Sequence, residues 1–188
     1  MPADDLPAFT ELGSEKAWEG RRLTIRRRRY RGPEGDEFER EFAHHPGAVG
    51  VIAVDDEGFV VLVRQFRAPM EGWILEMPAG TCDVEGEAPE ATARRELAEE
   101  VGLQASEWRL LAPLPVSPGV TDQVTRVYLA TRLSSTETNR DGAEERAMVV
   151  VRMPLDQVLA AVAAGERIDA PTVAGVALAQ RLLGRAGR

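Results

Sequence analysis

The segment Pro89–Val101 constrains the fold most strongly, because its pattern is that of a helix with one buried face. Successive helical residues turn by about 100°, so Ala93, Leu97 and Val101 form a single apolar stripe. A proline suits the first turn, and Gly102 suits the position just past the last one. We therefore expect a helix over residues 89–101 that packs by this stripe against a sheet.

The last turn of this helix carries three carboxylates, Glu96, Glu99 and Glu100. Like charges four residues apart cost a few tenths of a kcal/mol, and the helix dipole prefers cations at this end. A bound divalent cation removes both penalties, and oxygen ligands favour Mg²⁺, with Mn²⁺ as a substitute. The alternative is a solvated acidic face with Arg94 and Arg95 as surface partners.

The remainder of the chain is rich in strand-like segments. Residues 1–17 are polar and are expected to be irregular. Strands are expected at 18–30, 38–42, 48–54, 59–66, 73–77, 108–111, 124–131 and 148–153, and helices at 154–164 and 172–183. Regular alternation of strand and helix is missing, which indicates an α+β fold or a mixed-sheet sandwich. We expect a small β-strand subdomain over residues 1–45 and a larger domain over residues 46–188.

Composition narrows the class of protein. The 188 residues suffice for one domain with a sizeable core, and no apolar run approaches the roughly 20 residues that span a bilayer. The single cysteine, Cys82, excludes an intrachain disulfide framework and fits a reducing cytoplasm. A net charge of −8 argues against nucleic acid as a partner. We therefore expect a cytoplasmic protein that acts on a small anionic molecule.

The acidic helix and the loop before it together closely resemble the Nudix box. The resemblance rests on Gly80, Glu87, Arg95-Glu96-Leu97, Glu99-Glu100 and Gly102-Leu103. The family pattern has five residues between its glycine and its first glutamate, whereas six lie between Gly80 and Glu87. Either Glu85 or Glu87 can therefore supply the loop glutamate, and the spacing to Arg95 favours Glu87.

This resemblance implies a Nudix fold, an α/β/α sandwich around a mixed sheet, and a metal-dependent hydrolase of nucleoside diphosphates linked to another group. It implies that Glu96 and Glu100 are the main metal ligands. The further metal-site residues that it implies are Glu99, Glu87 and the backbone carbonyl of Ala79. Arg95 would orient the helix glutamates, and the number of metal ions stays open.

Outside the box, roughly residues 20–175 are similar to the ADP-ribose pyrophosphatase branch. The similarity lies in residues 39–42 with 47–49, in 64–67 with 73–80, in Ser117-Pro118-Gly119 and in Glu144-Glu145. It implies hydrolysis of ADP-ribose to AMP and ribose 5-phosphate. It also implies substrate contacts from Arg40, Arg67, Glu76, Pro118 and Gly119. Each of these features also has a purely structural explanation, such as strand ends for the arginines and a turn for Pro118-Gly119.

The base that activates the attacking water is expected on a late loop, with Glu145 preferred and Glu144 second. The branch also implies a homodimer formed through the N-terminal strands. Other substrates remain open, namely NADH, a sugar nucleotide such as GDP-mannose, or a dinucleoside polyphosphate. A non-hydrolysing sensor of ADP-ribose or NAD-related ligands is a further alternative, which the intact glutamates of the box disfavour.

Overall fold

The computed structural model describes residues 6–140 and 142–186. The chain separates into two compact units. The first consists of Met1–Pro46 with Pro115–Gln123, and the second of Gly47–Leu114 with Val124–Arg188. The segment 115–123 therefore belongs with the N-terminal strands, which the sequence did not indicate.

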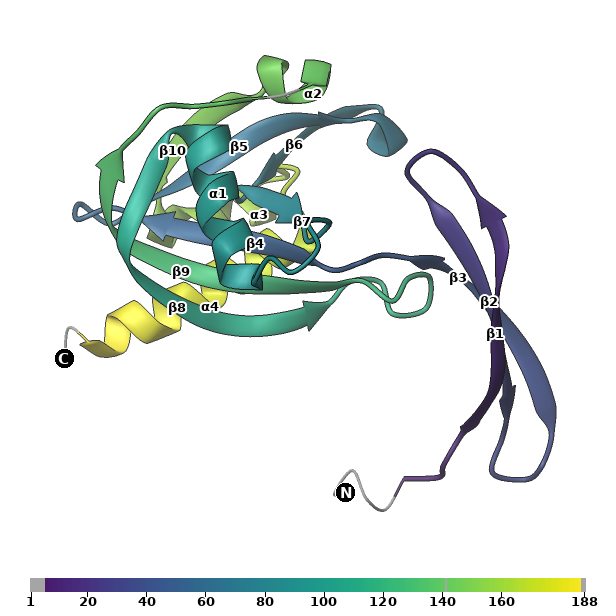
Figure 1. Cartoon of the computed structure of the whole chain (residues 1–188). Helices are drawn as coiled ribbons and strands as arrows, with labels where there is room; N and C mark the ends of the chain where they lie inside the picture. Colours follow the sequence, from purple (N-terminus) through teal and green to yellow (C-terminus); the bar gives the residue numbers. More distant parts are fainter. Residues whose placement is uncertain (1–5, 141, 187–188) are drawn as a thin grey trace. The chain divides into compact units, whose positions relative to one another are not determined.

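The first unit contains a three-stranded antiparallel sheet in the order β1-β2-β3 (Figure 1). Its strands are β1 (Thr10–Glu19), β2 (Thr24–Arg31) and β3 (Glu37–His44). The expectation of irregular structure over residues 1–17 is thus wrong from Thr10 onward, while residues 1–5 lie outside the described part. Almost every residue of β1 is exposed, so no alternation of apolar and polar residues marks it as a strand. The single strand expected over residues 18–30 is divided by a turn in which the Gly20 N–H donates to the Leu23 carbonyl at 2.8 Å.

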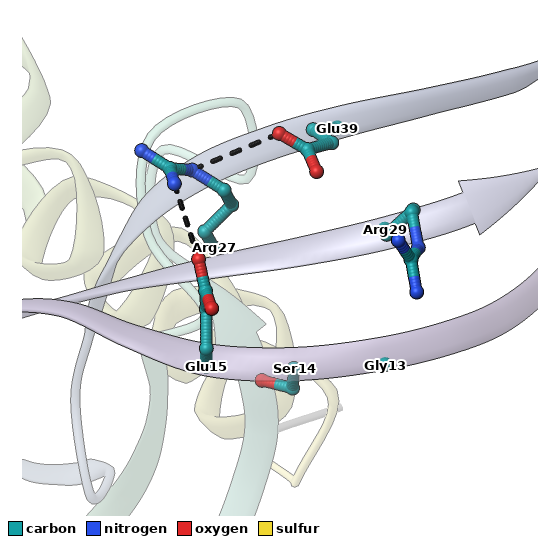
Figure 2. A pocket seen from close by; sticks show the side chains of 6 residues that line it. All are labelled: Gly13, Ser14, Glu15, Arg27, Arg29 and Glu39. Atoms are coloured by element: carbon teal, nitrogen blue, oxygen red, sulfur yellow. Dashed lines mark hydrogen bonds and ion pairs between the residues drawn. The ribbon is translucent and has the colours of Figure 1, made fainter.

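Charged side chains pair across this sheet and line a hollow of about 240 Å³ (Figure 2). Arg27 on the middle strand contacts Glu15 on β1 at 3.1 Å and Glu39 on β3 at 3.8 Å, and its Nε also donates to Glu41 at 3.0 Å. The hydrogen bond to Glu41 is the main reason that the pKa of Arg27 is raised. These groups are exposed, so they contribute little to stability and instead favour this register of the three strands.

The second unit is built on a mixed sheet in the order β10-β5-β4-β9-β8, with β6 paired to β5 and β7 paired to β4. β4 runs parallel to β9 and antiparallel to β5. The strands are β4 (Ala48–Val54), β5 (Phe59–Arg67), β6 (Gly72–Glu76), β7 (Ala79–Thr81), β8 (Leu103–Pro115), β9 (Val124–Ser135) and β10 (Val149–Pro154). Every residue of β4 is buried, which indicates that both faces of the sheet are covered.

Helices cover the two faces of this sheet (Figure 1). α1 (Pro89–Val101) packs Ala93 and Leu97 against Val49, Val51 and Ala53 on one face. On the other face, α3 (Val158–Ala163) and α4 (Ala170–Ala186) bury Val158 and Val176 with Ile52 and Leu62. Odd and even residues of β4 thus enter separate cores, as the period of two along a strand requires. The expected α+β fold, an α/β/α sandwich around a mixed sheet, is confirmed.

Most elements of the second unit match their expected positions. α1 has the expected bounds, and the strand bounds agree closely for β4 and β5. β8 is much longer than expected, β7 was not anticipated, and the helix expected from Pro154 consists of a 3-10 turn (η3, Leu155–Gln157) followed by α3. A second 3-10 turn, η2 (Ala68–Met70), precedes β6. Within the described residues, no helix has the length and apolar character needed to cross a bilayer.

Candidate active site

The position of the acidic last turn of α1 is set by the two ends of the helix and by the apolar stripe that packs on the sheet. It begins after Ala88, which is extended, with Pro89 in the first turn. It ends at Gly102, whose left-handed φ of 67° and ψ of 36° allow its N–H to return to the Ala98 carbonyl at 2.9 Å. The apolar stripe keeps the helix from rotating, so Glu96, Glu99 and Glu100 are held at one place.

Arg95 gathers three carboxylates around its guanidinium group. Its Nη1 donates to Glu96 at 2.8 Å and to Glu99 at 3.0 Å, and its Nε and Nη2 lie 3.3 Å from the two oxygens of Glu87. The hydrogen bonds to Glu87 are the main reason that the pKa of Arg95 is raised, with the charges of Glu96 and Glu87 and the bond to Glu99 adding to it. The structure therefore brings together the predicted orienting arginine and three of the predicted metal-site glutamates.

The loop glutamate that reaches this cluster is Glu87. Besides Arg95, it accepts a hydrogen bond from the buried Thr92 hydroxyl at 2.8 Å. The two bonds hold the pKa of Glu87 below its usual range, Arg95 having the larger effect. Glu85, the alternative that the sequence left open, is exposed. The geometry thus favours Glu87 for the loop position.

Glu100 is the most deeply buried carboxylate of the site, at 5% exposure. The Ala79 backbone N–H donates to it at 3.0 Å, which places the backbone of Ala79 directly beside its carboxylate. Burial raises the pKa of Glu100 to about 8; the Ala79 bond opposes this shift, and the charges of Glu96 and Glu145 add to it. Burial likewise raises the pKa of Glu96 to about 7, against the opposing effect of Arg95.

Gly80 leaves room for the Glu96 side chain. A Cβ atom built at Gly80 would overlap the carboxyl group of Glu96. Gly80 lies on β7, which pairs with β4 through Val49, so its backbone cannot move aside without disturbing the sheet. A glycine at position 80 therefore lets the Glu96 carboxylate approach the backbone closely, and a side chain there would displace that carboxylate. The φ of Gly80 is not in the left-handed region.

The two candidate bases lie on a short helix, α2 (Gly142–Ala147), so the expectation of a loop is wrong at these positions. Glu145 is half-buried and Glu144 is exposed. Glu145 is also near enough to raise the pKa of both Glu96 and Glu100 through its charge. Of the two candidates, Glu145 is therefore the one whose charge is shown to reach the predicted metal-site glutamates Glu96 and Glu100.

Arg67 and Glu76 form a second ionic group in the same unit. The Arg67 Nε donates to Glu76 at 2.9 Å, across the β5–β6 pair. Glu76 is 8% exposed, and burial raises the pKa of its carboxyl, an effect that Arg67 opposes and the charge of Asp169 reinforces. Arg67 also lowers the pKa of Glu100, so its guanidinium group lies within electrostatic reach of the acidic helix.

Three predicted substrate contacts belong to the first unit. The Arg40 guanidinium lies 4.7 Å from the centre of the Phe38 ring and donates to the Glu39 carbonyl at 2.7 Å. Pro118 and Gly119 lie in a turn that the Val120 N–H closes by donating to the Ser117 carbonyl at 2.8 Å. Arg67 and Glu76, in contrast, belong to the second unit, together with the acidic helix.

The sequence did not indicate two further residues, Asp169 beside the Arg67–Glu76 group and Arg140 at the end of the acidic helix. Asp169 precedes α4, and its carboxylate accepts the Thr172 N–H at 3.2 Å; burial raises its pKa. Arg140 donates to the carbonyl of Glu100 at 2.8 Å. The sequence could have indicated Asp169, because an aspartate just before a helix commonly caps it by accepting a backbone N–H of the first turn. A side chain that binds a distant backbone carbonyl leaves no comparable pattern.

The donor set fits a hard divalent cation. Glu96 and Glu100 offer two carboxylates whose burial and mutual repulsion a cation would offset. Arg95 binds Glu87, Glu96 and Glu99. Over residues 6–140 and 142–186, no three His, Cys, Asp or Glu side chains form a group that could hold a metal ion. Mg²⁺ commonly uses only one or two protein carboxylates and takes its other ligands from water and substrate phosphate. Two carboxylates and a nearby backbone therefore suffice.

Comparison with known proteins gives concordant matches. The family model described as NUDIX domain matches residues 44–174. An ADP-ribose pyrophosphatase of Mycobacterium tuberculosis is 40% identical over 89% of this chain and 81% of its own length. An ADP-ribose pyrophosphatase of Bacillus subtilis is 42% identical over 74% of this chain and 75% of its own. A methanol dehydrogenase activator of Bacillus methanolicus is 34% identical over 88% of this chain and 89% of its own length. A crystal structure of an ADP compounds hydrolase, 24% identical, has the same fold, with a TM-score of 0.81 over 97% of this chain and 96% of that one.

Proposed function

Because the chain belongs to the Nudix family and is a hydrolase of that family, we propose that it hydrolyses the pyrophosphate of ADP-ribose to AMP and ribose 5-phosphate with Mg²⁺. The observation that supports the proposal is that the charge of Glu145 reaches the buried pair Glu96 and Glu100 and raises the pKa of both. In the proposed site Glu96 and Glu100 would bind the cation, and the separate carboxylate of Glu145 would accept a proton. The two pyrophosphatase relatives support the choice of substrate.

In the proposed reaction a water oxygen attacks one phosphorus of the pyrophosphate, and the bond from that phosphorus to the bridging oxygen breaks. The bridging oxygen leaves with the other phosphate, and Glu145 accepts the proton of the water. A bound Mg²⁺ would neutralise charge on the phosphate oxygens and lower the pKa of the water. Glu96 and Glu100 would hold the ion, and Arg95 would keep Glu96 and Glu99 oriented.

Arg67 and Glu76 are proposed to position the substrate. A guanidinium group offers a planar fork of donors that suits phosphate or ribose oxygens. The bond from Arg67 to Glu76 at 2.9 Å orients that fork, and Glu76 itself can accept hydrogen bonds from hydroxyl or amino groups. Arg40, Pro118 and Gly119 are proposed as further substrate contacts, as the resemblance implies.

The base assignment is tested by Glu145→Gln, with Glu144→Gln as the matched control on the same helix. We expect Glu145→Gln to lower kcat by at least about 100-fold, the usual worth of a general base, with the affinity for ADP-ribose nearly unchanged. Glu144→Gln should retain turnover within about threefold, because its side chain is exposed. Full turnover in Glu145→Gln would reject the assignment.

The substrate is tested with a panel of ADP-ribose, NADH, GDP-mannose and diadenosine polyphosphates, each with Mg²⁺ and with Mn²⁺. We expect kcat/KM to be highest for ADP-ribose. GDP-mannose is a necessary member, because a GDP-mannose pyrophosphatase of Citrobacter koseri is 34% identical over 68% of this chain and 69% of its own length. Comparable rates on all substrates would contradict the specific proposal, and binding without any release of AMP would indicate a sensor.

We also propose that the protein is a homodimer formed through residues 1–45. The first unit has little core of its own and exposes the large apolar side chains Leu6, Phe9, Trp18 and Leu23. Small sheets are marginal in water without a surface to cover them, and a second copy of the chain would provide one. Light scattering should give twice the 20.5 kDa chain mass, and a monomer would refute the proposal.

A further inference from the structure

Arg140 joins two backbone carbonyls that lie on separate elements. Its Nε donates to the carbonyl of Glu100 at 2.8 Å, and its Nη1 donates to the carbonyl of Met148 at 2.9 Å. The first carbonyl belongs to the last turn of α1, and the second directly follows α2. One half-buried guanidinium group therefore ties the end of the acidic helix to the end of the short helix that carries Glu145.

The second carbonyl belongs to a buried residue, Met148, which is itself bonded to Glu145. The Met148 side chain is 3% exposed, and its backbone N–H donates to the carbonyl of Glu145 at 3.1 Å. Arg140 precedes α2 and Met148 follows it, so their bond closes a small loop around the six residues of the helix. Contacts along this loop thus run from Glu100 through Arg140 and Met148 to Glu145.

Neighbouring residues hold the same helix end but do not reach across α2. The Asn139 N–H donates to the Glu99 carbonyl at 3.1 Å, and the Thr136 N–H donates to the Gly102 carbonyl at 2.8 Å. These two bonds come from the backbone and would survive a change of side chain. The Arg140 guanidinium has several donors fixed in one plane, whereas a lysine ammonium is a single point charge. An arginine is therefore suited to hold two carbonyls at a set separation.

We propose that Arg140 is a positioning residue that sets the place of Glu145 relative to Glu96 and Glu100. The inference rests on the proposed function, in which Glu145 accepts the proton of the attacking water. A displacement of about 1 Å at a reacting group can cost on the order of 100-fold in rate, so a clamp on a six-residue helix has a measurable effect. Arg140 itself binds backbone carbonyls and need not touch the substrate.

The competing role for Arg140 is an electrostatic cap for α1, since cations are favoured at the end of a helix. Lysine at position 140 would keep that charge but could not hold both carbonyls. A cap alone therefore predicts that Arg140→Lys behaves as the parent protein. The positioning role predicts that Arg140→Lys and Arg140→Gln both lower kcat.

The experiment compares Arg140→Gln and Arg140→Lys with Arg146→Gln, a control that removes an exposed arginine from α2 itself. Hydrogen–deuterium exchange of residues 142–148 is measured without substrate, and kcat and KM for ADP-ribose are measured with Mg²⁺. We expect Arg140→Gln to speed exchange in this segment, leave α1 protected, and lower kcat by about 10- to 100-fold with KM within about threefold. Arg140→Lys should lose about tenfold in kcat, and Arg146→Gln should match the parent protein in every measurement.

A double variant decides whether Arg140 acts through Glu145. In the Glu145→Gln background, Arg140→Gln should change kcat by less than about twofold, because the group that it positions is already lost. Three results would each overturn the inference. Arg140→Gln could leave both hydrogen exchange and kcat unchanged, Arg140→Lys could keep the parental kcat, or the losses in kcat of the two single variants could multiply in the double variant. If Glu145→Gln alone keeps full kcat, the proposed base fails and the positioning role falls with it. The exchange measurement needs no substrate, so failure of ADP-ribose as substrate is recognised separately.

Discussion

Replacing Glu100 by glutamine is expected to stabilise the metal-free protein at alkaline pH while removing metal-dependent turnover. Glu100 is 5% exposed, and burial raises the pKa of its carboxyl from the ordinary 4.5 to about 8. One pKa unit corresponds to about 1.4 kcal/mol, so a shift of this size is worth up to about 5 kcal/mol. Water and the chain rearrange around a new charge, and we therefore expect a measured effect of about 2 to 5 kcal/mol.

The direction of the pKa shift determines the pH dependence of stability. The folded carboxyl binds its proton more tightly than the unfolded one does. The contribution of Glu100 to the free energy of unfolding of the metal-free parent protein is therefore most favourable below pH 4.5, falls between pH 4.5 and about 8, and is level above that range. A glutamine cannot ionise, and its amide oxygen can still accept the Ala79 N–H. The variant should consequently lack this part of the pH dependence.

The assay is urea unfolding in EDTA at pH 5 and pH 9, with Glu85→Gln as the control because Glu85 is exposed in the loop before α1. Glu100→Gln should lie within about 1 kcal/mol of the parent protein at pH 5 and exceed it by about 2 to 5 kcal/mol at pH 9. The control should stay within about 0.5 kcal/mol of the parent at both. Mg²⁺ at about 100 times its Kd should add about 2.7 kcal/mol to the parent protein and much less to Glu100→Gln. A variant less stable than the parent at pH 9, or a difference that does not change with pH, would refute the reasoning.

Three further changes test the rest of the site. Gly80→Ala should raise the Mg²⁺ concentration for half-maximal activity by at least about tenfold, because the added Cβ displaces the Glu96 carboxylate. Its circular dichroism spectrum should stay unchanged, and a normal Mg²⁺ dependence would contradict this expectation. Glu87→Gln should lower the free energy of unfolding in chemical denaturation, because it loses charged bonds to Arg95 and Thr92. An effect no larger than that of Glu85→Gln would count against the loop assignment. Arg67→Lys should raise KM for ADP-ribose by about tenfold with a smaller change in kcat, because it loses the fork that Glu76 orients; a loss confined to kcat would argue for a different role.

The acidic helix could be predicted from the sequence because every local signal agrees. The apolar stripe, the proline of the first turn and Gly102 all indicate the same residues, and the bounds Pro89–Val101 are those observed. The fully apolar run Ala48–Val54 likewise predicted a strand that proved to be buried throughout. Both elements pack against the core, where burial imposes a pattern on the sequence.

The strand β1 could not be predicted, because burial imposes no such pattern on it. Thr10–Glu19 pairs with β2 along its length but exposes nearly every side chain, so apolar and polar residues have no reason to alternate. Most of its partners are arginines of β2, as in the pairs of Glu15 with Arg27 and Ser14 with Arg28. Pairing of this kind is decided by a neighbouring strand and not by the segment itself.

The candidate site was predictable in its glutamates but not in the contacts that hold them. The spacing within the helix placed Glu96, Glu99 and Arg95 correctly with respect to one another, since helical geometry is regular. The group formed by Glu76, Arg67 and Asp169 depends on the pairing of β5 with β6 and on the start of α4. Such contacts arise only when distant elements pack, and sequence spacing carries no record of them.

The acids at the end of α1 face two electrostatic penalties, and the structure relieves them by different means. The negative end of the helix dipole is met by the cationic side chain of Arg140, which donates to the Glu100 carbonyl at 2.8 Å. The crowding of carboxylates is relieved by Arg95, but only for Glu96 and Glu99. Glu100 has the Ala79 N–H and the more distant charge of Arg67, and neither prevents burial from raising its pKa to about 8. If the proposed metal site is correct, Glu100 is consequently the carboxylate of this helix whose ionisation near neutral pH would gain most from a bound cation.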